Sequence, residues 1–593
     1  MRVSRVVIRN VRAIEFADVP LTETTTLVIG ENNTGKSSFI HAIRLCLDVG
    51  LSSAYRALTK EDIYCTVDQT QPFQAFVGVE FTGFQGNENE EALLQGTQVE
   101  ANRARIFYRF RPKRTIRELI ARQALDRPLT KDDYSWELFG GGNPAIDLTQ
   151  IAWNHENDEL GATSVGLQYL QSYLVVFLPA LRDVEGDLQQ PRRSPLLRLV
   201  EASDIPVAEQ QTIVDAVRNA NTLIEATPTV REIAQSIDRA FTEVTGPAFD
   251  LGIEIGLSAP SFQSIIRNLI LLLSNPIVSH FEPRRNGLGL NNILYIAILI
   301  EQFRKRAAAG KAAGELILVE EPEAHLHPQL QATLMDAIRG LPFQTIATTH
   351  STQVTAGASL SSYVVLTQRP GASSLAAVPS RAPNLTDNDR HDLERYLDAT
   401  KSNLLFARRV MLVEGAAELL LLPSLVKQVM GIDLEREGIS VVAVHGVHFG
   451  PFSRLFSDDC LPKKCAIVGD ADYQPEAVPD GDDVPIRPNL ADLLGQYVRV
   501  FVGATTFERE ITLHQNLGML IATAADLGAP RIRNDLETLN IPGGAVSEAV
   551  KDKVLRTAKR FGKGRFAQVA NRHVAQAGAL PQYIIDAVNW LRE

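Results

Sequence analysis

TLVIGENNTGKSSFIHAIRL, residues 26–45, carries a short apolar strand into a helix through a glycine-rich loop. The loop has the spacing GxxxxGKS from Gly30 to Ser37, and its glycines allow backbone N–H groups to turn inward around a phosphate at the start of a helix. We expect Lys36 to reach the β- and γ-phosphates of a nucleotide and Ser37 to bind Mg²⁺. A chance glycine-rich turn is the alternative, but the flanking strand and helix favour a phosphate-binding loop. The predicted ATP-binding residues of the loop are Gly30, Asn32, Asn33, Thr34, Gly35, Lys36, Ser37 and Ser38.

A second strand, in ELILVEEPEAHLHP (residues 315–328), ends in two acids. In a P-loop ATPase, Glu320 would hold Mg²⁺ through water, and Glu321 would polarise the attacking water. The strand in QTIATTH, residues 344–350, ends at His350. A lone histidine can be an ordinary core residue, but its place after the acidic strand indicates a sensor of the γ-phosphate. We therefore assign Glu320 and Glu321 to ATP binding, and Glu321 and His350 to catalysis.

About 280 residues separate Lys36 from Glu320, far more than in a compact GTPase-like domain. A head interrupted by a large insertion is the layout of ABC-type ATPases. RNGLGLNN, residues 285–292, precedes an expected helix (293–303), where such heads carry the segment that meets the γ-phosphate of a partner subunit. Gly287 and Gly289 fit this segment, although the usual Ser-Gly-Gly core is absent. This reading predicts a dimer in which two subunits complete each ATP site.

The beginning of the chain resembles ATPase heads of the structural-maintenance-of-chromosomes and RecF class. The resemblance rests on VVIRNVRAIEF (residues 6–16) and on VPLTETTTLVIGENNTGKSS (residues 19–38). Glu320 departs from the broader ABC pattern, which prefers aspartate at that place. The EEPEAHLHP form is nevertheless common in the bacterial branch of these ATPases.

The insertion is predicted to be helical over about 195–275, after a buried strand in VVFLPALRD (residues 175–183). Apolar positions recur at three and four residues in TIVDAVRNANTLI, VREIAQSIDRAF and FQSIIRNLILLL. Ordinary core helices and a dimerisation arm are not separable by this periodicity. Because the segment is too short for a long coiled coil, we favour a compact helical dimerisation module.

The second half of the chain alternates strands and helices. Apolar strands are expected in RRVMLVEG, ISVVAVHG, KCAIVGDAD and YVRVFVG, which begin at residues 408, 439, 464 and 497. This alternation predicts a parallel sheet with helices on both faces. Ligands gather at the carboxyl ends of such strands. There, Glu414 ends the first strand, and Asp470 and Asp472 end the third.

Three carboxylates converging on one edge of a sheet would repel one another unless a cation neutralised them. A water-exposed turn is the alternative for GDAD taken alone. Oxygen-only ligation indicates Mg²⁺ or Mn²⁺ rather than zinc. Glu…Asp-x-Asp in a four-strand unit resembles the Toprim pattern found in topoisomerases, primases and some nucleases. We predict two ions, with Glu414, Glu418, Asp470, Asp472 and Glu508 as the metal ligands, and Ser37 as the ligand of a third ion that accompanies ATP.

Further residues narrow the predicted chemistry. Glu418 lies one helical turn after Glu414, and TTFERE (residues 505–510) supplies Glu508, with Glu510 as its alternative. Lys563, in GKGRFA, could meet a scissile phosphate or stabilise a leaving group. Two metals about 4 Å apart can activate water and stabilise the departing oxygen of a phosphodiester. A topoisomerase would need a tyrosine nucleophile, and we find no tyrosine that fits this role.

The order of these motifs is similar to the OLD (overcoming lysogenisation defect) family of bacterial and phage nucleases. The resemblance rests on an ABC-type head followed by EGxxE, DxD, TxE-like and KGRFA elements, and on the linker LDATKSNLLFARRVMLVEG (residues 397–415). It implies dimers or higher assemblies, metal-dependent DNA nicking and cleavage, frequent anti-phage roles and sometimes a helicase-like partner. The regions 90–170 and 195–275 carry no part of it.

Composition agrees with an intracellular enzyme. The chain has 593 residues, of which 45% are hydrophobic, and a net charge of −11 that argues against a passive coat on DNA. No apolar run reaches the roughly 18 residues of a membrane helix, so we expect no association with a membrane. The four cysteines lack the spacing of a metal site and indicate a reducing compartment, so we expect a cytoplasmic protein. Two basic stretches, residues 108–117 and 551–565, could be solvated faces or nucleic-acid paths.

The sequence thus predicts an α/β chain with five segments: an ATPase head in two parts (1–190 and 279–375), a helical insertion (191–278), a linker (376–407) and a Toprim domain (408–593). The leading functional hypothesis is an ATP-regulated, metal-dependent DNA endonuclease. One alternative is a non-cutting ATP-sensing scaffold or DNA loader. Another is a topoisomerase-like enzyme, which covalent protein–DNA adducts would reveal.

Overall fold

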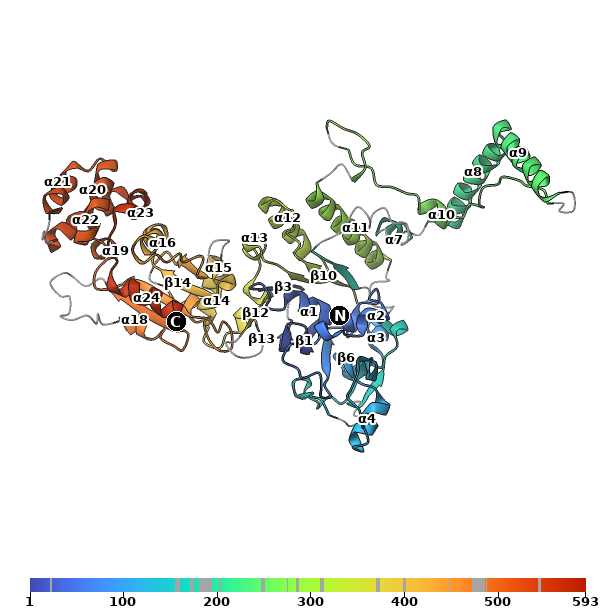
Figure 1. Cartoon of the computed structure of the whole chain (residues 1–593), viewed down its shortest axis with the longest axis horizontal. Helices are drawn as coiled ribbons and strands as arrows, with labels where there is room; N and C mark the ends of the chain where they lie inside the picture. Colours follow the sequence, from blue (N-terminus) through green and yellow to red (C-terminus); the bar gives the residue numbers. More distant parts are fainter. Residues whose placement is uncertain are drawn as a thin grey trace. The chain divides into compact units, whose positions relative to one another are not determined.

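The fold is that of a computed structural model of the whole chain (Figure 1). The residues that the structure describes are 1–21, 24–154, 160–170, 175–180, 195–201, 203, 205–246, 251–274, 276–283, 287–309, 314–368, 374–397, 402–446, 448–471, 486, 488–541 and 546–593. Contacts divide the chain into two compact units. The first comprises Met1–Ala180, Ala313–Glu323 and His327–Glu593, and the second comprises Leu181–Ala312 and Ala324–Leu326. The five predicted segment boundaries remain a prediction.

The head of the first unit contains an antiparallel sheet of seven strands. Their order is β2-β1-β4-β6-β7-β8, and β5 pairs with β6. The strands are β1 (Arg2–Val11), β2 (Ile14–Pro20), β4 (Ala75–Thr82), β5 (Gln98–Glu100), β6 (Arg103–Pro112), β7 (Tyr134–Gly141) and β8 (Ala162–Ser164).

A second sheet of the head has the order β13-β12-β3-β11-β10-β9 and is parallel except for the pair β12–β13. Its strands are β3 (Thr25–Gly30), β9 (Val175–Leu178), β10 (Leu316–Glu320), β11 (Gln344–Thr348), β12 (Tyr363–Gln368) and β13 (Ser374–Ala377). Helix α1 (Lys36–Leu47) contacts strands of both sheets, and its apolar residues join the main core of the head. The phosphate-binding loop is therefore anchored between two sheets.

The C-terminal part of the first unit contains the predicted four-stranded parallel sheet, with the order β15-β14-β16-β17. Its strands are β14 (Arg409–Val413), β15 (Ile439–Ala443), β16 (Cys465–Asp470) and β17 (Val498–Gly503). Its larger helices are α16 (Ala416–Met430), α20 (Leu517–Asp526), α21 (Pro530–Leu539), α22 (Glu548–Phe561), α23 (Lys563–Arg572) and α24 (Gln582–Arg592). Because α23 packs on α16, and α24 on β16 and β17, the end of the chain is part of this domain.

The first unit contains further helices, of which α12 and α14 are the longest. They are α2 (Ser53–Arg56), α3 (Glu88–Leu94), α4 (Arg114–Ala121), α5 (Leu167–Leu170), α12 (Pro328–Arg339), α13 (Thr352–Thr355), α14 (Asp387–Tyr396), α15 (Asn403–Phe406), α17 (Gly450–Ser453), α18 (Pro488–Ala491) and α19 (Phe507–Glu510).

The second unit is helical. It contains α7 (Pro195–Glu201), α8 (Val207–Glu225), α9 (Pro228–Thr245), α10 (Phe262–Ile266) and α11 (Leu288–Ala308). The helical pattern of residues 262–273 is only partly correct, because α10 ends at Ile266. The prediction that a helix starts at residue 293 is also wrong, since α11 begins five residues earlier, with Gly287 as its N-cap.

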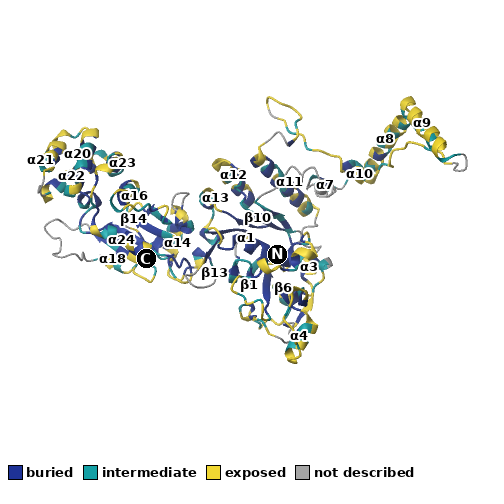
Figure 2. Cartoon of the chain, viewed as in Figure 1, coloured by how far each residue is buried: buried dark blue, intermediate teal, exposed yellow. Residues whose placement is uncertain are grey.

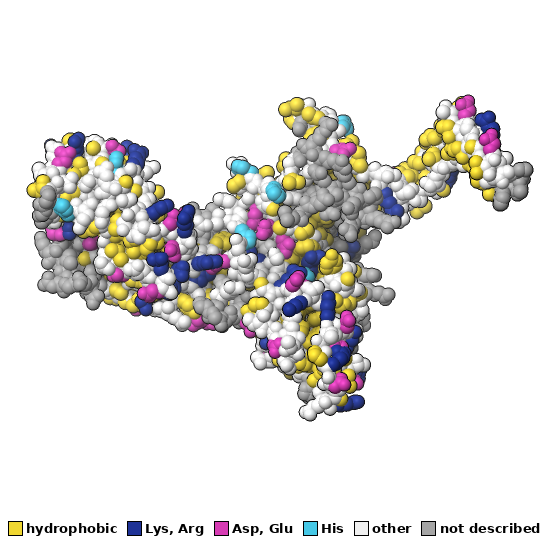
Figure 3. Space-filling model, viewed as in Figure 1, with side chains coloured by type: hydrophobic (Ala, Val, Ile, Leu, Met, Phe, Trp, Pro, Cys, Tyr) yellow, Lys and Arg dark blue, Asp and Glu magenta, His cyan; other side chains and the backbone are white. Residues whose placement is uncertain are grey.

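Helices α8 and α9 bury almost none of their apolar side chains. Val214 is the only buried residue in α8, and α9 has none (Figure 2). The exposed apolar residues of the pair include Val207, Ile213, Leu223, Ile224, Ile233, Ile237 and Val244 (Figure 3). An isolated helix of this length is marginal in water, and most helices in proteins are stabilised by packing an apolar face. This surface, which we call the α8–α9 apolar face, therefore lacks its packing partner within the described residues.

Three of the four arginines in the basic stretch at residues 108–117 form neither a solvated face nor a nucleic-acid path, whereas Arg114 is exposed. Arg109, Arg111 and Arg117 are all buried. Arg109 donates a hydrogen bond to the Gln74 side chain at 2.9 Å, and Arg111 forms a 2.7 Å ion pair with Glu137. Inside the antiparallel sheet, the Arg109 side chain is thus hydrogen-bonded and the Arg111 side chain is ion-paired, and such partners are the usual condition for burying polar and charged groups.

Candidate functional site

The phosphate-binding loop closes tightly around its own lysine. Lys36 Nζ donates hydrogen bonds to the carbonyl oxygens of Gly30 (2.9 Å) and Glu31 (2.6 Å). Gly30 has φ +151°, and a Cβ there would lie 2.3 Å from the carbonyl oxygen of Leu366. Only glycine fits this position, because a side chain would collide with backbone of β12. The loop thus holds the ammonium where the sequence predicts that it meets phosphates.

Burial of Lys36 changes its protonation. Burial lowers the pKa of Lys36 to about 8, although Glu321, Glu31 and Glu323 oppose this shift. The group therefore remains mostly protonated near neutral pH and loses its charge above pH 8.

The predicted magnesium residues of the head meet in the structure. The hydroxyl of Ser37 hydrogen-bonds the Glu320 carboxylate, and burial, which is the larger effect, raises the pKa of Glu320. Glu320 ends β10 and is in register with Thr348 of β11. A hydroxyl and a carboxylate side by side next to Lys36 offer the oxygen ligands that Mg²⁺ prefers. Of the remaining loop residues, Asn32 and Asn33 are exposed, and Thr34 and Ser38 are buried; their contact with ATP remains a prediction.

Glu321 and His350 lie opposite each other across the ends of β10 and β11. The distance from His350 Nε2 to Glu321 Oε1 is 3.8 Å. Glu321 has φ +45°, a conformation that is uncommon for residues other than glycine, and its N–H donates to Thr348 at 2.9 Å. Burial lowers the pKa of His350, and Lys36 lowers it further while Glu321 opposes the shift. The imidazole is thus biased towards its neutral form.

Glu323 is a residue of this site that the sequence analysis missed. Its Oε1 accepts hydrogen bonds from the Thr349 hydroxyl and the His350 N–H, both at 2.8 Å. Burial raises the pKa of Glu323, and these bonds oppose the shift. The carboxylate therefore joins the segment after β10 to the segment after β11. Its signal in the sequence was the third glutamate of EEPE, two residues after Glu321.

Gly287 and Gly289 belong to the second unit. Gly287 is the N-cap of α11, and Gly289 lies in its first turn. A Cβ on Gly289 would lie 2.3 Å from the carbonyl oxygen of His325, so glycine allows the helix to approach that backbone. Their predicted contact with ATP of a partner subunit remains a prediction.

At the carboxyl edge of the C-terminal sheet, the acids of β14 and β16 lie next to each other. Glu414 follows β14, and its Oε1 accepts a 2.8 Å hydrogen bond from the N–H of Asp470. Asp470 is buried, with only 4% of its surface exposed. Burial raises the pKa of Asp470 well above its usual range, and the nearby charges of Glu414 and Glu418 add to the effect.

Helices bring two more acids and a base to the same edge. Glu418 is buried in the first turn of α16, and burial, with the charges of Glu508 and Glu414, raises its pKa. Lys563 opens α23, and its Nζ lies 2.9 Å from Glu508 Oε2. Burial lowers the pKa of Lys563, but Glu508, Asp470 and Glu418 together raise it above its ordinary value. This group, which we call the acidic cluster, comprises Glu414, Glu418, Asp470, Glu508 and Lys563.

The two candidate glutamates after β17 have different surroundings. Glu510 accepts hydrogen bonds from the N–H and the hydroxyl of Thr505, at 2.9 and 2.5 Å, and so stabilises the local turn. Glu508 is buried, faces Lys563, and has no hydrogen-bond donor to its Oε1 among the described residues. The geometry therefore favours Glu508 as the member of the site.

The residues of the acidic cluster fit divalent cations. A buried carboxylate oxygen without a donor, beside carboxyl groups whose pKa values are raised by burial and by one another, is stabilised by a cation with oxygen preference. Asp472, the remaining predicted ligand, lies outside the described residues. Within the described part of the chain, no three acidic, histidine or cysteine side chains are close enough to form a complete metal site.

Comparisons with known proteins agree with the two-part organisation. A model of the AAA ATPase domain matches residues 1–169 and 266–355, and one of the overcoming lysogenization defect protein-like TOPRIM domain matches residues 405–472. The Old nuclease of Escherichia phage P2 is 23% identical over 75% of this chain and 73% of its own. The OLD nuclease of Thermus scotoductus is 24% identical over 74% of this chain and 77% of its own.

Among solved structures, the C-terminal region of the Burkholderia pseudomallei OLD protein is 27% identical. The match covers 32% of this chain and 98% of that one, with a TM-score of 0.25. The family models and the relatives confirm the predicted fold class, an ABC/SMC-like P-loop head followed by a Toprim domain with a parallel sheet. With its ATPase head followed by an OLD-like Toprim domain, the chain is similar to the OLD nucleases over about three quarters of its length, in agreement with the resemblance seen in the sequence.

Proposed function

We propose that the chain is an ATP-regulated, divalent-metal-dependent DNA endonuclease that nicks or cleaves by two-metal phosphodiester hydrolysis. The observation that carries this proposal is the acidic cluster, in which buried carboxylates and Lys563 share the carboxyl edge of a parallel sheet. Burying several acids together is costly for folding, so the arrangement needs a functional reason. The nuclease names of two relatives support the same conclusion.

In this proposal, Glu414, Glu418, Asp470, Asp472 and Glu508 hold two Mg²⁺ or Mn²⁺ ions. When bound, the ions supply an activated water and neutralise the departing oxygen. The Asp470 N–H fixes the orientation of the Glu414 carboxylate through its 2.8 Å bond. Lys563, whose raised pKa keeps it protonated, places a positive charge beside the scissile phosphate.

The head is proposed to bind and hydrolyse ATP. Lys36 binds the phosphates, and Ser37 and Glu320 hold the accompanying Mg²⁺. Glu321 and His350 lie 3.8 Å apart, and both can contact a water molecule placed between them. Dimerisation through the α8–α9 apolar face would bury its exposed side chains and bring two heads together.

The wider role stays a prediction. It comprises anti-phage defence or DNA metabolism and a helicase-like partner, for which family resemblance is the main support, and a cytoplasmic location, which the cysteines and the short apolar runs of the sequence predict. Among the described residues, no helix combines the length and apolar character that a membrane crossing requires.

A plasmid nicking assay tests the proposed activity. Purified chain should convert supercoiled plasmid to nicked circles with Mg²⁺ or Mn²⁺, and excess EDTA should stop the reaction. Asp470→Ala, prepared in parallel, should not nick. Nicking that survives both EDTA and this substitution would come from a contaminating nuclease, and an inactive parent that still binds DNA would favour the scaffold alternative.

A further inference from the structure

The nucleotide loop is joined to the Toprim sheet by an ionic contact. Glu31, directly after Gly30, forms a 3.1 Å ion pair with Arg408 Nε and lies 3.5 Å from Lys463 Nζ. Arg408 directly precedes β14, and Lys463 lies two residues before β16. Glu414 directly follows the first of these strands, and Asp470 is the last residue of the second. The cations that hold Glu31 and the acids of the proposed nuclease site are thus at opposite ends of the same strands.

Lys463 is a fixed member of this contact. It is buried, and its ammonium donates hydrogen bonds to the carbonyl oxygens of Ala407 (2.7 Å) and Leu405 (3.2 Å). Burial lowers the pKa of Lys463, while Glu31 opposes the shift. A residue held on three sides cannot leave without exposing several unpaired polar groups.

Arg408 differs from Lys463 in burial and in partners. Its side chain is 76% exposed, and Glu31 is its only ion-pair partner among the described residues. Its aliphatic stem packs beside Gly438, since a Cβ placed on Gly438 would lie 3.3 Å from Cβ and Cδ of Arg408. An exposed ion pair of this kind contributes little to stability. The guanidinium can therefore exchange Glu31 for a stronger anion at low cost.

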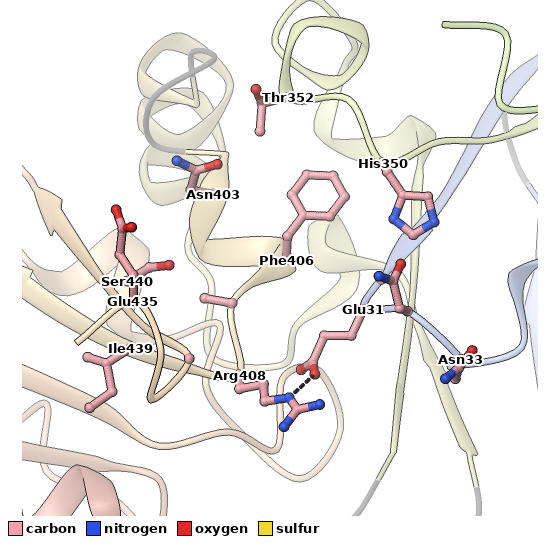
Figure 4. A pocket seen from close by; sticks show the side chains of 14 residues that line it. Glu31, Asn33, His350, Thr352, Asn403, Phe406, Arg408, Glu435, Ile439 and Ser440 are labelled. Carbon is pink, nitrogen blue, oxygen red and sulfur yellow. Dashed lines mark hydrogen bonds and ion pairs between the residues drawn. The ribbon is translucent and has the colours of Figure 1, made fainter. Parts of the chain in front are cut away.

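Glu31 and Arg408 both line a polar pocket of about 570 Å³ (Figure 4). The nucleotide loop lines it through Gly30, Glu31, Asn32 and Asn33, and His350 and Arg408 lie on its walls. Lys36, the expected ligand of the β- and γ-phosphates, donates to the carbonyl of Glu31 at 2.6 Å. A nucleotide bound to Lys36 would thus lie at the loop that carries Glu31, the residue that holds Arg408.

We propose that Arg408 is a second phosphate-binding residue of the nucleotide site, which leaves Glu31 and binds the γ-phosphate of ATP. A phosphate offers the guanidinium two parallel charge-assisted hydrogen bonds, which are stronger than its single exposed bond to Glu31. Lys463 still neutralises Glu31 after Arg408 has left. ADP lacks the γ-phosphate and leaves the Glu31–Arg408 pair intact. Arg408, which directly precedes β14, therefore distinguishes ATP from ADP.

The inference deepens the proposed function, since it rests on ATP binding by the head. The test is isothermal calorimetry of the full chain with Mg²⁺, using ADP and the ATP analogue with an imido β–γ bridge, which is not hydrolysed. Arg408→Ala should weaken binding of the ATP analogue about tenfold, the effect of one charge-assisted interaction, and leave ADP within twofold. Arg408→Lys should recover part of the loss. Arg436→Ala, an exposed arginine outside the pocket, is the matched control and should change neither affinity.

Lys36→Ala separates failure of the inference from failure of the proposed function. If Lys36→Ala leaves both affinities unchanged, or the parent binds neither nucleotide, the ATP site is wrong and the inference falls with it. If Lys36→Ala abolishes binding, the site stands. In that case, an Arg408→Ala variant that loses neither nucleotide, or both equally, overturns only the role of Arg408.

Discussion

Lys563 and Glu508 form an ion pair, with 2.9 Å between Nζ and Oε2, although one lies in α23 and the other in α19. Glu508 is 1% exposed, so the contact is inside the domain. Helix α23 also packs on α16, which carries Glu418. The helical C-terminal region therefore supplies the one lysine of the acidic cluster and holds it against the acids of the sheet.

Lys563→Ala should lower the rate of plasmid nicking about a hundredfold, because it removes the positive charge proposed to lie beside the scissile phosphate. Lys563→Arg keeps the charge but changes the shape of the donor, and should recover part of the rate. Initial rates in Mn²⁺ measure the effect. Lys559→Ala, an exposed lysine of the same basic stretch, should nick like the parent. Equal rates for Lys563→Ala and Lys559→Ala would remove Lys563 from the site.

Binding of ATP should weaken as the pH rises from 7 to 9. The pKa of Lys36 is lowered by burial to about 8. Below that value the ammonium is present and attracts the phosphates, and above it most free protein has a neutral amine that must first take up a proton. Lys36→Arg stays charged over this range and should bind with an affinity that changes little with pH. Fluorescence titration at several pH values measures the affinity for ATP. If the affinity of the parent does not change up to pH 9, the prediction is contradicted.

Glu321→Gln should lose ATP turnover by about a hundredfold, within the range for a missing general base, while ATP still binds. The amide cannot accept a proton from water, but it keeps the shape of the side chain opposite His350. Lys36→Ala should abolish hydrolysis by preventing binding instead. Phosphate release and nucleotide retention on a filter separate the two losses. Parental turnover in either variant would remove the head from its proposed role.

Local patterns were enough to predict the elements that carry chemistry. The glycine-rich loop lies between β3 and α1, and Glu414 and Asp470 end neighbouring parallel strands, as the apolar runs before them indicated. A strand fixes where its last side chain emerges, so short-range sequence decides these positions. The choice of Glu508 over Glu510 needed the structure, because it depends on which glutamate faces Lys563.

Long-range pairing could not be predicted from the same patterns. In the sequence, Arg111 belongs to a basic stretch. Only the structure shows that Glu137, on the neighbouring strand β7, neutralises it. Glu31 and Arg408 are 377 residues apart, and no periodicity connects them. The apolar run after Ile266 looked helical because spacing alone does not reveal whether a face has anything to pack against.

Charges placed on the α8–α9 apolar face should dissociate the proposed dimer. Ile233→Glu with Ile237→Glu puts two carboxylates where exposed apolar side chains would be buried by a second copy. Light scattering after gel filtration should show the parent mass halved. Arg239→Glu, which by helical spacing lies on the opposite side of α9, is the control and should leave the mass unchanged. A double variant with the parental mass would show that the copies associate elsewhere, if they associate at all.

Asp470→Ala should abolish nicking in Mg²⁺ or Mn²⁺ and leave ATPase activity within a few-fold of the parent. Loss of one metal ligand is expected to lower the nicking rate on the order of a thousandfold. Glu414→Ala and Asp472→Ala should behave alike, and combining them should add little, because the residues act as one unit. Parental nicking by Asp470→Ala would place the active site elsewhere.

The same aspartate should make metal-free stability depend on pH in a defined direction. Its pKa in the folded chain is raised by burial and by Glu414 and Glu418, so the folded state binds a proton more tightly than the unfolded state. Metal-free parent should therefore gain stability as the pH falls through this raised pKa, and should be least stable above it.

Asp470→Asn cannot ionise and should melt at a higher temperature than the parent at neutral pH, with the difference shrinking as the pH is lowered. Added Mn²⁺ should reverse the order of the two melting temperatures. The ion neutralises the carboxylates of the parent, whereas the variant lacks one of the carboxylates that would bind it. Scanning calorimetry of both proteins, with and without Mn²⁺, measures these four melting temperatures. If the variant without metal melts at or below the parent at neutral pH, the ionised Asp470 does not destabilise the fold, and the repulsion assigned to the acidic cluster is wrong.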